Sequence, residues 1–333
     1  MKKLLTYFGI GLCLLILMGT VNPVPEARAK TQYFVWTTGG VGGTWYPLGS
    51  GIASYITKNV EGISIAAQAS GGAMENLNLI NSNQADFGFL PSAPAYTAYR
   101  GMKPFDKPHK NMVGIGMLHQ NSVYAFALRK SGIKSYYDLR GKKVQTGAAG
   151  AGATLICSMV LAGHDMTLDD IVPTHLPIRE SSDALKDGRI SAIFTTSAIP
   201  GAAVLDVASV RDITIIDYAP GAMDKILAKE PYFLKTTIPA GTYRGVDREV
   251  PILGEGTLVT CSPSLPEDVV YTVTKTIYSK ACLDYLKKIH SAAKTIRPGD
   301  GLNGMTMKLH PGAAKYWKEV GLYDAWDAQK PYN

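Results

Sequence analysis

The sequence has few of the residues from which catalytic and metal sites are built. It contains four cysteines and six histidines in 333 residues, and no pair of histidines has the HExxH spacing or another spacing typical of zinc ligands. A GxSxG nucleophile elbow is also absent. We therefore expect a protein that is not an enzyme, with no catalytic residues, no bound metal and no cofactor.

Long apolar runs are absent after the first thirty residues. The one apolar run, residues 4–18, follows the basic pair Lys2 and Lys3 and precedes an Ala27-x-Ala29 step. This is the layout of a cleavable secretory signal, and the run is shorter than the roughly 20 residues that a membrane helix needs. Residues 1–29 are thus predicted to be a signal peptide, with an uncleaved N-terminal anchor as the alternative.

Cysteines are too few to form a disulfide framework in the exported chain. Cys157, Cys261 and Cys282 remain after residue 29, an odd number without a CxxC motif. Cys261 and Cys282 could pair in an oxidising compartment. A buried free thiol is the alternative for each of the three.

Clustered positive charge is absent as well, although the formal net charge is +7. The basic residues are scattered and form no stripe interleaved with aromatic residues, which is the pattern typical of nucleic-acid binding. We expect no nucleic-acid partner.

Strand-like and helix-like segments alternate along the chain, which is typical of α/β proteins. Periodicity predicts strands at 32–37, 63–69, 85–90, 124–129, 143–146, 190–195, 213–217 and 256–261. It predicts helices at 47–58, 74–80 and 154–162, one that ends at 183–188, one that begins at Pro200, one in 264–279 and one at 311–321. About 300 residues are enough for two domains.

A glycine-rich loop, residues 39–43, lies between the first predicted strand and helix. It is not a Walker A loop, because Thr44 and Trp45 stand where Lys and Ser or Thr are required, and Trp45 also replaces the last glycine of the dinucleotide fingerprint. Such a loop presents backbone N–H groups and the positive end of a helix dipole to an anion. Trp45 and Tyr46 would form one wall of the site; a tight turn with core aromatics is the alternative.

A second loop of the same kind, residues 147–153, precedes the helix at 154–162. Its side chains are glycine and alanine, so any ligand contact there is made through backbone N–H groups. Close packing of a helix on a strand is the alternative.

Seven stretches together resemble the TAXI family, the solute-binding receptors of TRAP-type secondary transporters. They are TGGVGGTWYPLG (38–49), ASGGAMENLNLINSNQADFGF (69–89), DLRGKKVQTGAAGAGA (138–153), ESSDALKDGRISAIF (180–194), IPAGTY (238–243), LPEDVVYTVTK (265–275) and LHPGAAKYWKEVG (309–321). They occur in the family's order and cover essentially the whole exported chain.

The resemblance implies a two-lobed, type II periplasmic-binding-protein fold of the Venus-flytrap kind. Lobe 1 would comprise residues 30–122 and 256–333, lobe 2 residues 123–255, with crossovers near 120–124 and 255–259. A small organic anion, a carboxylate or an amino acid such as glutamate, would be held between the lobes in the periplasm and passed to a TRAP-type membrane permease. A ligand-sensing partner of a membrane receptor kinase and a secreted enzyme are the alternatives.

By position in the family motifs, the resemblance also implies a set of ligand-binding residues. They are Gly40, Gly42, Gly43, Thr44, Trp45, Tyr46, Ser70, Gly71, Gly72, Ser92, Gly150, Ala151, Gly152, Ala153, Thr195, Thr196 and Pro200.

Three departures from the family pattern fall in or near this set. Pro91-Ser92-Ala93 replaces Gln-Ser-Asp, residues 150–153 replace Gly-Ser-Gly-Thr, and residues 119–121 replace a Tyr-Pro-Glu-like step. The loss of these polar groups predicts a ligand that is less polar than glutamate or is bound mainly through one carboxylate.

Overall fold

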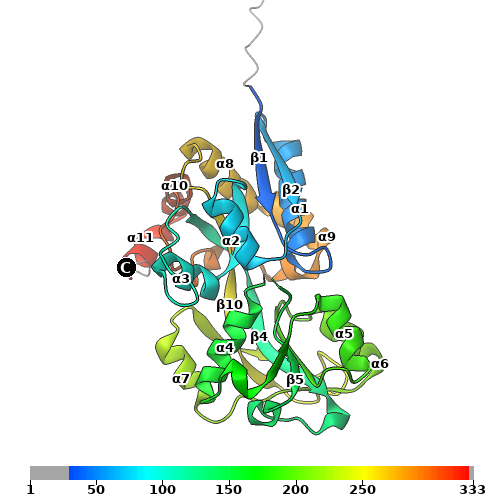
Figure 1. Cartoon of the computed structure of the whole chain (residues 1–333). Coiled ribbons are helices and arrows are strands. Elements are labelled where there is room, and N and C mark those ends of the chain that lie inside the picture. Colours follow the sequence, from blue (N-terminus) through cyan, green and yellow to red (C-terminus); the bar gives the residue numbers. More distant parts are fainter. Residues whose placement is uncertain (1–29, 150, 330–333) are drawn as a thin grey trace, which may run out of the picture.

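The computed structural model describes residues 30–149 and 151–329, which form an α/β structure around a ten-stranded mixed sheet (Figure 1). The strands are β1 (Gln32–Thr37), β2 (Ile63–Gln68), β3 (Phe87–Pro91), β4 (Val113–Leu128), β5 (Lys143–Gln145), β6 (Val172–Thr174), β7 (Ala192–Ser197), β8 (Ile213–Ile215), β9 (Phe233–Ile238) and β10 (Val250–Cys261). Their main order is β2-β1-β3-β10-β4-β7-β5-β6, with β8 on β4 and β9 on β10.

Helices connect most of these strands and cover the sheet. They are α1 (Trp45–Asn59), α2 (Ala73–Asn81), α3 (Ser92–Arg100), α4 (Ala153–Gly163), α5 (Ile178–Lys186), α6 (Ala202–Val210), α7 (Ala222–Lys229), α8 (Glu267–Ile277), α9 (Lys280–Ile289), α10 (Pro311–Glu319) and α11 (Tyr323–Asp327). Short 3₁₀ helices lie at Arg129–Ser131, Tyr136–Leu139, Leu168–Asp170, Ser291–Thr295 and Pro298–Asp300.

Hydrophobic periodicity explains why the first elements form where they do. Leu48, Ile52 and Ile56 recur every four residues on α1 and are all fully buried, as the spacing of one helix face requires. β3 reads FGFLP and is buried along its whole length, which suits a strand with neighbours on both sides and layers on both faces. The predicted strand at 32–37 has the same bounds as β1.

The buried hydrophobic residues form two clusters. The first includes Trp36, Leu48 and Trp317 and collects β1 to β3 with α1 and the C-terminal helices. The second includes Val144 and Phe194 and collects the chain from the second half of β4 to the first half of β10. Two cores confirm the α/β class and the two-lobed organisation.

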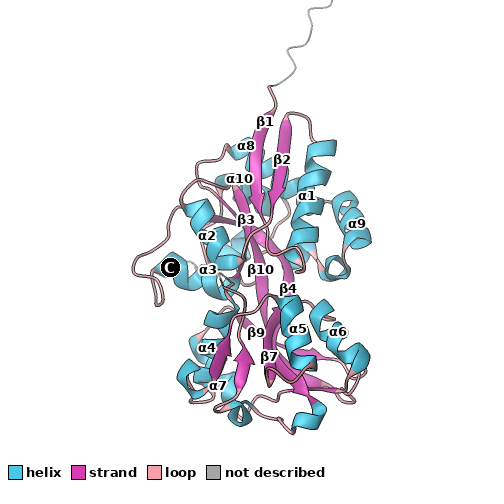
Figure 2. Ribbon diagram, turned by 45° about the vertical axis from the view of Figure 1, so that its right-hand side comes forward, coloured by secondary structure: helices cyan, strands magenta, loops and turns pink. Residues whose placement is uncertain are grey.

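β4 and β10 run through both clusters (Figure 2). Within β4, Ile115 belongs to the first cluster and Phe126 to the second, while β10 contributes Leu253 to the second and Leu258 to the first. The two strands pair antiparallel from Leu253↔Val123 to Cys261↔Val113. These strands connect the lobes; the limits of the lobes at residues 122/123 and 255/256 stay a prediction.

Several elements differ from the sequence prediction. β6, β9, α7, α9, α11 and the first half of β10 were not predicted, and β4 and α3 differ for a physical reason. β4 begins at Val113, whereas the predicted strand began at 124. The prediction missed the first half of β4 because that half is buried on both faces and its sequence does not alternate between apolar and polar residues. α3 was not predicted, since SAPAYTAYR is short and carries a proline, which a helix accepts in its first turn.

The predicted signal peptide, residues 1–29, lies outside the described residues. Within residues 30–149 and 151–329, no helix is both long and apolar enough to cross a bilayer. Cys157, Cys261 and Cys282 are buried free thiols, so the predicted alternative of a Cys261–Cys282 disulfide is not realised.

Asn76 on α2 holds together the ends of two strands and the loop that follows a third. Its Nδ2 atom donates to the carbonyl oxygens of Thr38 at 2.7 Å and Phe89 at 2.9 Å. Its Oδ1 atom accepts from the hydroxyls of Thr37 and Ser70, both at 2.6 Å. The Asn76 side chain is fully buried, so its partners at Thr37, Thr38 and Phe89 have little access to water as a replacement.

Replacing Asn76 by Ala should lower the free energy of unfolding by about 2–4 kcal/mol, because buried polar groups lose their partners. Chemical denaturation measures this change. The matched control is Asn78→Ala on an exposed position of the same helix, where we expect a change within about 0.5 kcal/mol. Equal stability of the two variants would show that Asn76 does not hold these strand ends.

Candidate functional site

The first two predicted ligand loops lie side by side at the carboxyl ends of β1 and β2. These strands pair in parallel, and open α/β sheets bind ligands at such ends. The backbone N–H of Ser70 donates to the carbonyl of Gly39 at 3.3 Å, and Gly43 N–H donates to Gly40 at 2.9 Å. Gly40, Gly42 and Gly43 are exposed. The structure thus brings loops 39–44 and 69–72 together.

Two of the predicted backbone donors already have partners in the chain. Gly71 N–H donates to the Glu75 carboxylate at 2.7 Å, and Gly72 N–H donates to the Ser70 hydroxyl at 3.1 Å. The backbone N–H groups of Ala73 and Met74, in the first turn of α2, have no hydrogen-bond acceptor in the described part of the chain. A ligand at the start of α2 would therefore meet the first helical turn and the acidic Glu75, rather than the glycines.

The second glycine-rich loop places the N-terminus of α4 next to the N-termini of α2 and α3. Gly152 is buried, and a Cβ atom placed on it would lie 2.7 Å from Pro94 Cγ and 3.1 Å from Ala73 Cβ. Ala151 N–H donates to the Ala148 carbonyl at 3.0 Å, and Ala153 begins α4. Gly150 lies outside the described residues. The lobes are in direct contact here.

The lobes also approach each other on the side of α1. A Cβ atom on Gly42 would lie 3.8 Å from Ile178 Cγ2, at the start of α5. The start of α4 therefore lies against the starts of α2 and α3, and the loop before α1 approaches the start of α5. We call this region the lobe junction: loops 39–44, 69–72, 147–149, 151–153 and 176–178 and the crossing part of β4 and β10.

One face of the crossing strands carries three polar side chains at the junction. Trp45 Nε1 donates to Thr257 Oγ1 at 3.2 Å, and Asn121 Nδ2 donates to the same oxygen at 2.8 Å. Glu255 stands directly opposite Asn121 in the pairing and shares its face, because paired residues of antiparallel strands point the same way. We call Asn121, Glu255 and Thr257 the crossing triad. Trp45 at the start of α1 closes over it and packs on Phe89.

Glu255 is fully buried, and neither of its carboxyl oxygens has a hydrogen-bond partner in the described part of the chain. Burial raises the pKa of Glu255 from 4.5 to about 8, opposed by the backbone N–H of Ala93 at the start of α3. Burial is the main cause of the raised pKa values of Tyr218 and Tyr232; for Tyr232 the hydrogen bond to Glu230 comes next, and ionised Glu255 adds a smaller effect on both. At neutral pH the side chain is therefore mostly a neutral acid.

Ser92 differs from its predicted role. It is fully buried, and its hydroxyl donates to the Gly256 carbonyl at 3.3 Å. A Cβ atom on Gly256 would lie 2.8 Å from Ser92 Oγ. Because neighbouring residues of a strand point to opposite faces, Ser92 lies on the side of β10 away from the crossing triad. Ser92 therefore packs against β10 and does not face the junction.

Thr195 and Thr196 point to opposite faces of β7, so they cannot both face the junction. Thr195 pairs with Tyr124 and donates to Ser197 Oγ at 3.3 Å. Thr196 pairs with Val123, on the face that carries the crossing triad. Thr196 is thus the threonine placed toward the junction side of the sheet.

Pro200 is exposed and precedes α6, which begins at Ala202. The N–H of Gly201, at the N-terminus of α6, donates to Tyr243 Oη at 2.8 Å. Tyr243 Oη also lies 3.1 Å from Tyr124 Oη. This helix terminus already has a partner from the chain.

The crossing triad was missed as a binding group by the sequence analysis, which used its segments only as lobe crossovers. One signal was present: in LGEGTLV a single acid stands between two glycines in an otherwise apolar strand. The pairing of Glu255 with Asn121, 134 positions earlier, depends on the fold.

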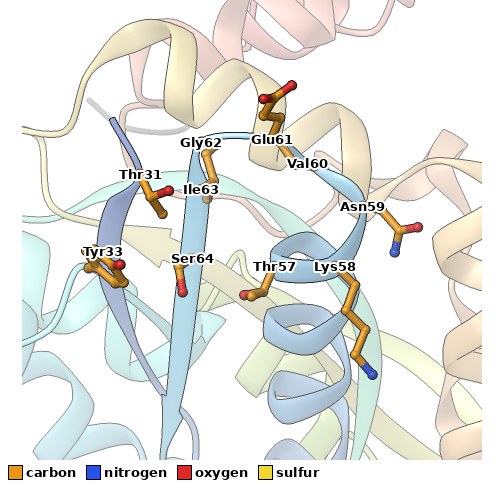
Figure 3. A pocket seen from close by; sticks show the side chains of 10 residues that line it. All are labelled: Thr31, Tyr33, Thr57, Lys58, Asn59, Val60, Glu61, Gly62, Ile63 and Ser64. Carbon is orange, nitrogen blue, oxygen red and sulfur yellow. The ribbon is translucent and has the colours of Figure 1, made fainter. Parts of the chain in front are cut away.

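One surface hollow lies away from the lobe junction. It measures about 490 Å³ and is lined by residues at the start of β1, the end of α1 and the start of β2 (Figure 3). Tyr33, Lys58 and Ser64 are among them, at the end of β1 opposite to loop 39–44. No group of three or more His, Cys, Asp and Glu side chains suited to a metal ion occurs among residues 30–149 and 151–329.

Replacing Glu255 by Gln should stabilise the protein at neutral pH. The folded pKa is raised, so the unfolded state loses the proton from pH 4.5 upward while the folded state retains it to about pH 8. Stability therefore falls as pH rises through this window, by about 3 kcal/mol at pH 7. The Gln variant does not ionise at this position, so its free energy of unfolding should not fall over this pH range. Below pH 4.5 the variant and the wild type should be equally stable.

Urea denaturation between pH 4 and 9 measures the difference, with Glu249→Gln as the matched control at an exposed position before β10. The control should follow the wild type at every pH. A Glu255→Gln curve parallel to the wild type would mean that Glu255 has an ordinary pKa.

Comparison with solved structures shows the same fold. A protein from Bordetella bronchiseptica RB50 is 16% identical, with 87% of this chain and 89% of that chain covered and a TM-score of 0.52. The periplasmic aliphatic sulphonate binding protein of Escherichia coli is 13% identical over 81% of this chain and 80% of its own, with a TM-score of 0.47. The alkanesulfonate-binding protein of Xanthomonas axonopodis pv. citri, bound to MOPS, is 12% identical over 92% and 96%, with a TM-score of 0.47.

At these identities the likeness concerns the fold alone, an α/β fold of two lobes, each with its own core. A family model also matches the chain, from residue 36 to residue 321. The chain belongs to the NMT1-like family.

Proposed function

We propose that this protein is the periplasmic solute-binding receptor of a TRAP-type secondary transporter, of the TAXI family, and that it binds a small organic anion with a carboxylate. The observation that carries the proposal is the lobe junction. Helix N-termini from both lobes meet there, beside two strands that connect the lobes. Backbone N–H groups at helix starts are suited to a carboxylate.

Hinge closure is the proposed mechanism, with no bond broken in the ligand. β4 and β10 are the continuous connections that can bend, while each lobe keeps its own core. In this proposal the close approaches of Gly152 to Pro94 and of Gly42 to Ile178 belong to the closed arrangement. A ligand that touches both lobes favours closure through its higher affinity for the closed state.

The proposed binding set follows the geometry. Loop 39–46, Ser70 to Met74 and residues 151–153 would surround the ligand, with the crossing triad beneath it and Thr196 to one side. Ser92 and Thr195 are not part of this set. Export through residues 1–29 and delivery to a membrane permease complete the proposal, supported by the sequence resemblance.

A fluorescence titration tests this function. Binding of a carboxylate or amino acid should change the emission of Trp45, because its indole lies on the crossing triad. Trp45→Phe should lose most of the signal and keep affinity within about tenfold, since one hydrogen bond contributes about 1 kcal/mol. Failure of every carboxylate and amino acid tested, together with no organic anion in mass spectra of protein purified from its host, would contradict the proposal.

Replacing Gly152 by Val should oppose closure. The new side chain would overlap Pro94 and Ala73 across the lobes, so affinity should fall at least tenfold, equivalent to about 1.4 kcal/mol. Small-angle scattering should show a larger radius of gyration with ligand than for the wild type. Gly299→Ala is the control, because nothing lies within 4 Å of its new atom; equal closure of both variants would contradict the role of this contact.

A further inference from the structure

The lobe junction contains acids without a matching cation. Glu255 lies on its floor, and Glu75 lies at the start of α2. Among the described residues, neither carboxylate forms an ion pair with Lys, Arg or His. Glu75 is an acid in a site that is expected to bind an anion, and Glu255 would add a second negative charge when it ionises. A ligand that brings a positive group would supply the cation that the chain does not.

Glu255 lies on the face of the crossing strands that borders the junction, and its side chain is fully buried there. It shares a face with Asn121 and Thr257, and Thr257 is the residue that the Trp45 indole contacts. The start of α3 supplies the nearby N–H of Ala93. A fully buried carboxyl group whose two oxygens have no partner is rare in folded proteins, because removal from water is costly.

We propose that Glu255 binds the ammonium group of the transported solute, so that the protein selects amino-acid-like zwitterions over simple carboxylates. The inference rests on the proposed function, since it assumes that the solute occupies the lobe junction. The solute carboxylate lies at the N-termini of α2 and α4, and its ammonium group donates to Glu255. Asn121 and Thr257 orient that carboxylate from below.

Charge explains the selection. An ammonium group supplies the cation that buried Glu255 lacks, and a charge-assisted hydrogen bond forms where water is excluded. A hydroxyl group at the same position supplies no charge, and a second carboxylate would repel the ionised form of Glu255. The loss of polar side chains in residues 151–153 leaves the other end of the solute to backbone N–H groups and apolar contacts.

Ammonium binding requires Glu255 to ionise, so the binding reaction should release a proton. The groups that face Glu255 are His119 on β4, Tyr218 after β8, Tyr232 before β9, and Glu230, which accepts a hydrogen bond from Tyr232. Burial holds the pKa of His119 at about 4 and raises those of both tyrosines above 10. Between pH 6 and 8 the released proton therefore comes from Glu255.

Isothermal titration calorimetry at pH 7 with matched pairs of probes tests the inference. The pairs are L-norvaline with 2-hydroxypentanoate and L-glutamate with 2-hydroxyglutarate, each measured in two buffers of different ionisation enthalpy. The amino acid of the better pair should bind at least tenfold more tightly than its hydroxy partner. Its binding should release close to one proton, about 0.9 for a group of pKa 8 at pH 7.

Glu255→Gln should abolish the proton release and reduce the preference for the amino acid at least tenfold, while Glu249→Gln should change neither. A hydroxy acid that binds as tightly as its amino acid, or proton uptake on binding, would overturn the inference and leave the proposed function standing. If neither member of either pair binds, the mass-spectrometric identification of the natural solute decides: a solute without an ammonium group overturns the inference, and the absence of any organic anion overturns the proposed function. Proton release is measured on the wild type, so it does not depend on the folding of the variant.

Discussion

The pairing of β4 with β10 is the constraint on which the rest of the structure depends. The two strands stay hydrogen-bonded from Val113↔Cys261 to Val123↔Leu253. Each strand has one end in the first core and the other end in the second core. Because both backbones pass directly from one lobe to the other, the lobes can move relative to each other by bending these strands without breaking either core. The same arrangement places residues far apart in sequence on one face at the centre of the molecule.

Burial at this crossing links stability to function. Asn121 and Thr257 have hydrogen-bond partners, but the carboxyl group of Glu255 has none among the described residues. An apolar residue would pack there at lower cost, so the acid weakens the fold unless a ligand completes its interactions. Buried groups with strongly shifted pKa values are common at functional sites. The helix N-termini near Glu255 also favour the lobe junction as the binding site.

The sequence predicted local structure well and contacts between distant segments poorly. β1 followed from the short apolar run QYFVWT, and the buried face of α1 followed from the spacing of Leu48, Ile52 and Ile56. Loops 39–44 and 147–153 were placed between strand and helix, where the structure has them. Ser92 was expected to face the ligand, but the direction of a side chain beside a strand depends on pairing register. Glu255 was overlooked for the same reason. Its burial and its position opposite Asn121 depend on the pairing of β10 with β4, two strands that are far apart in the sequence.

A crystal structure of the protein with the solute that it carries from its native host would test the central claim most directly. The account predicts density for one small molecule between loop 39–46 and residues 151–153, with a carboxylate at the first turns of α2 and α4. A nitrogen atom of that molecule should lie within hydrogen-bonding distance of the Glu255 carboxylate. Solute density at the hollow beside Tyr33 and Lys58, or a solute at the junction that leaves Glu255 without a contact, would contradict it.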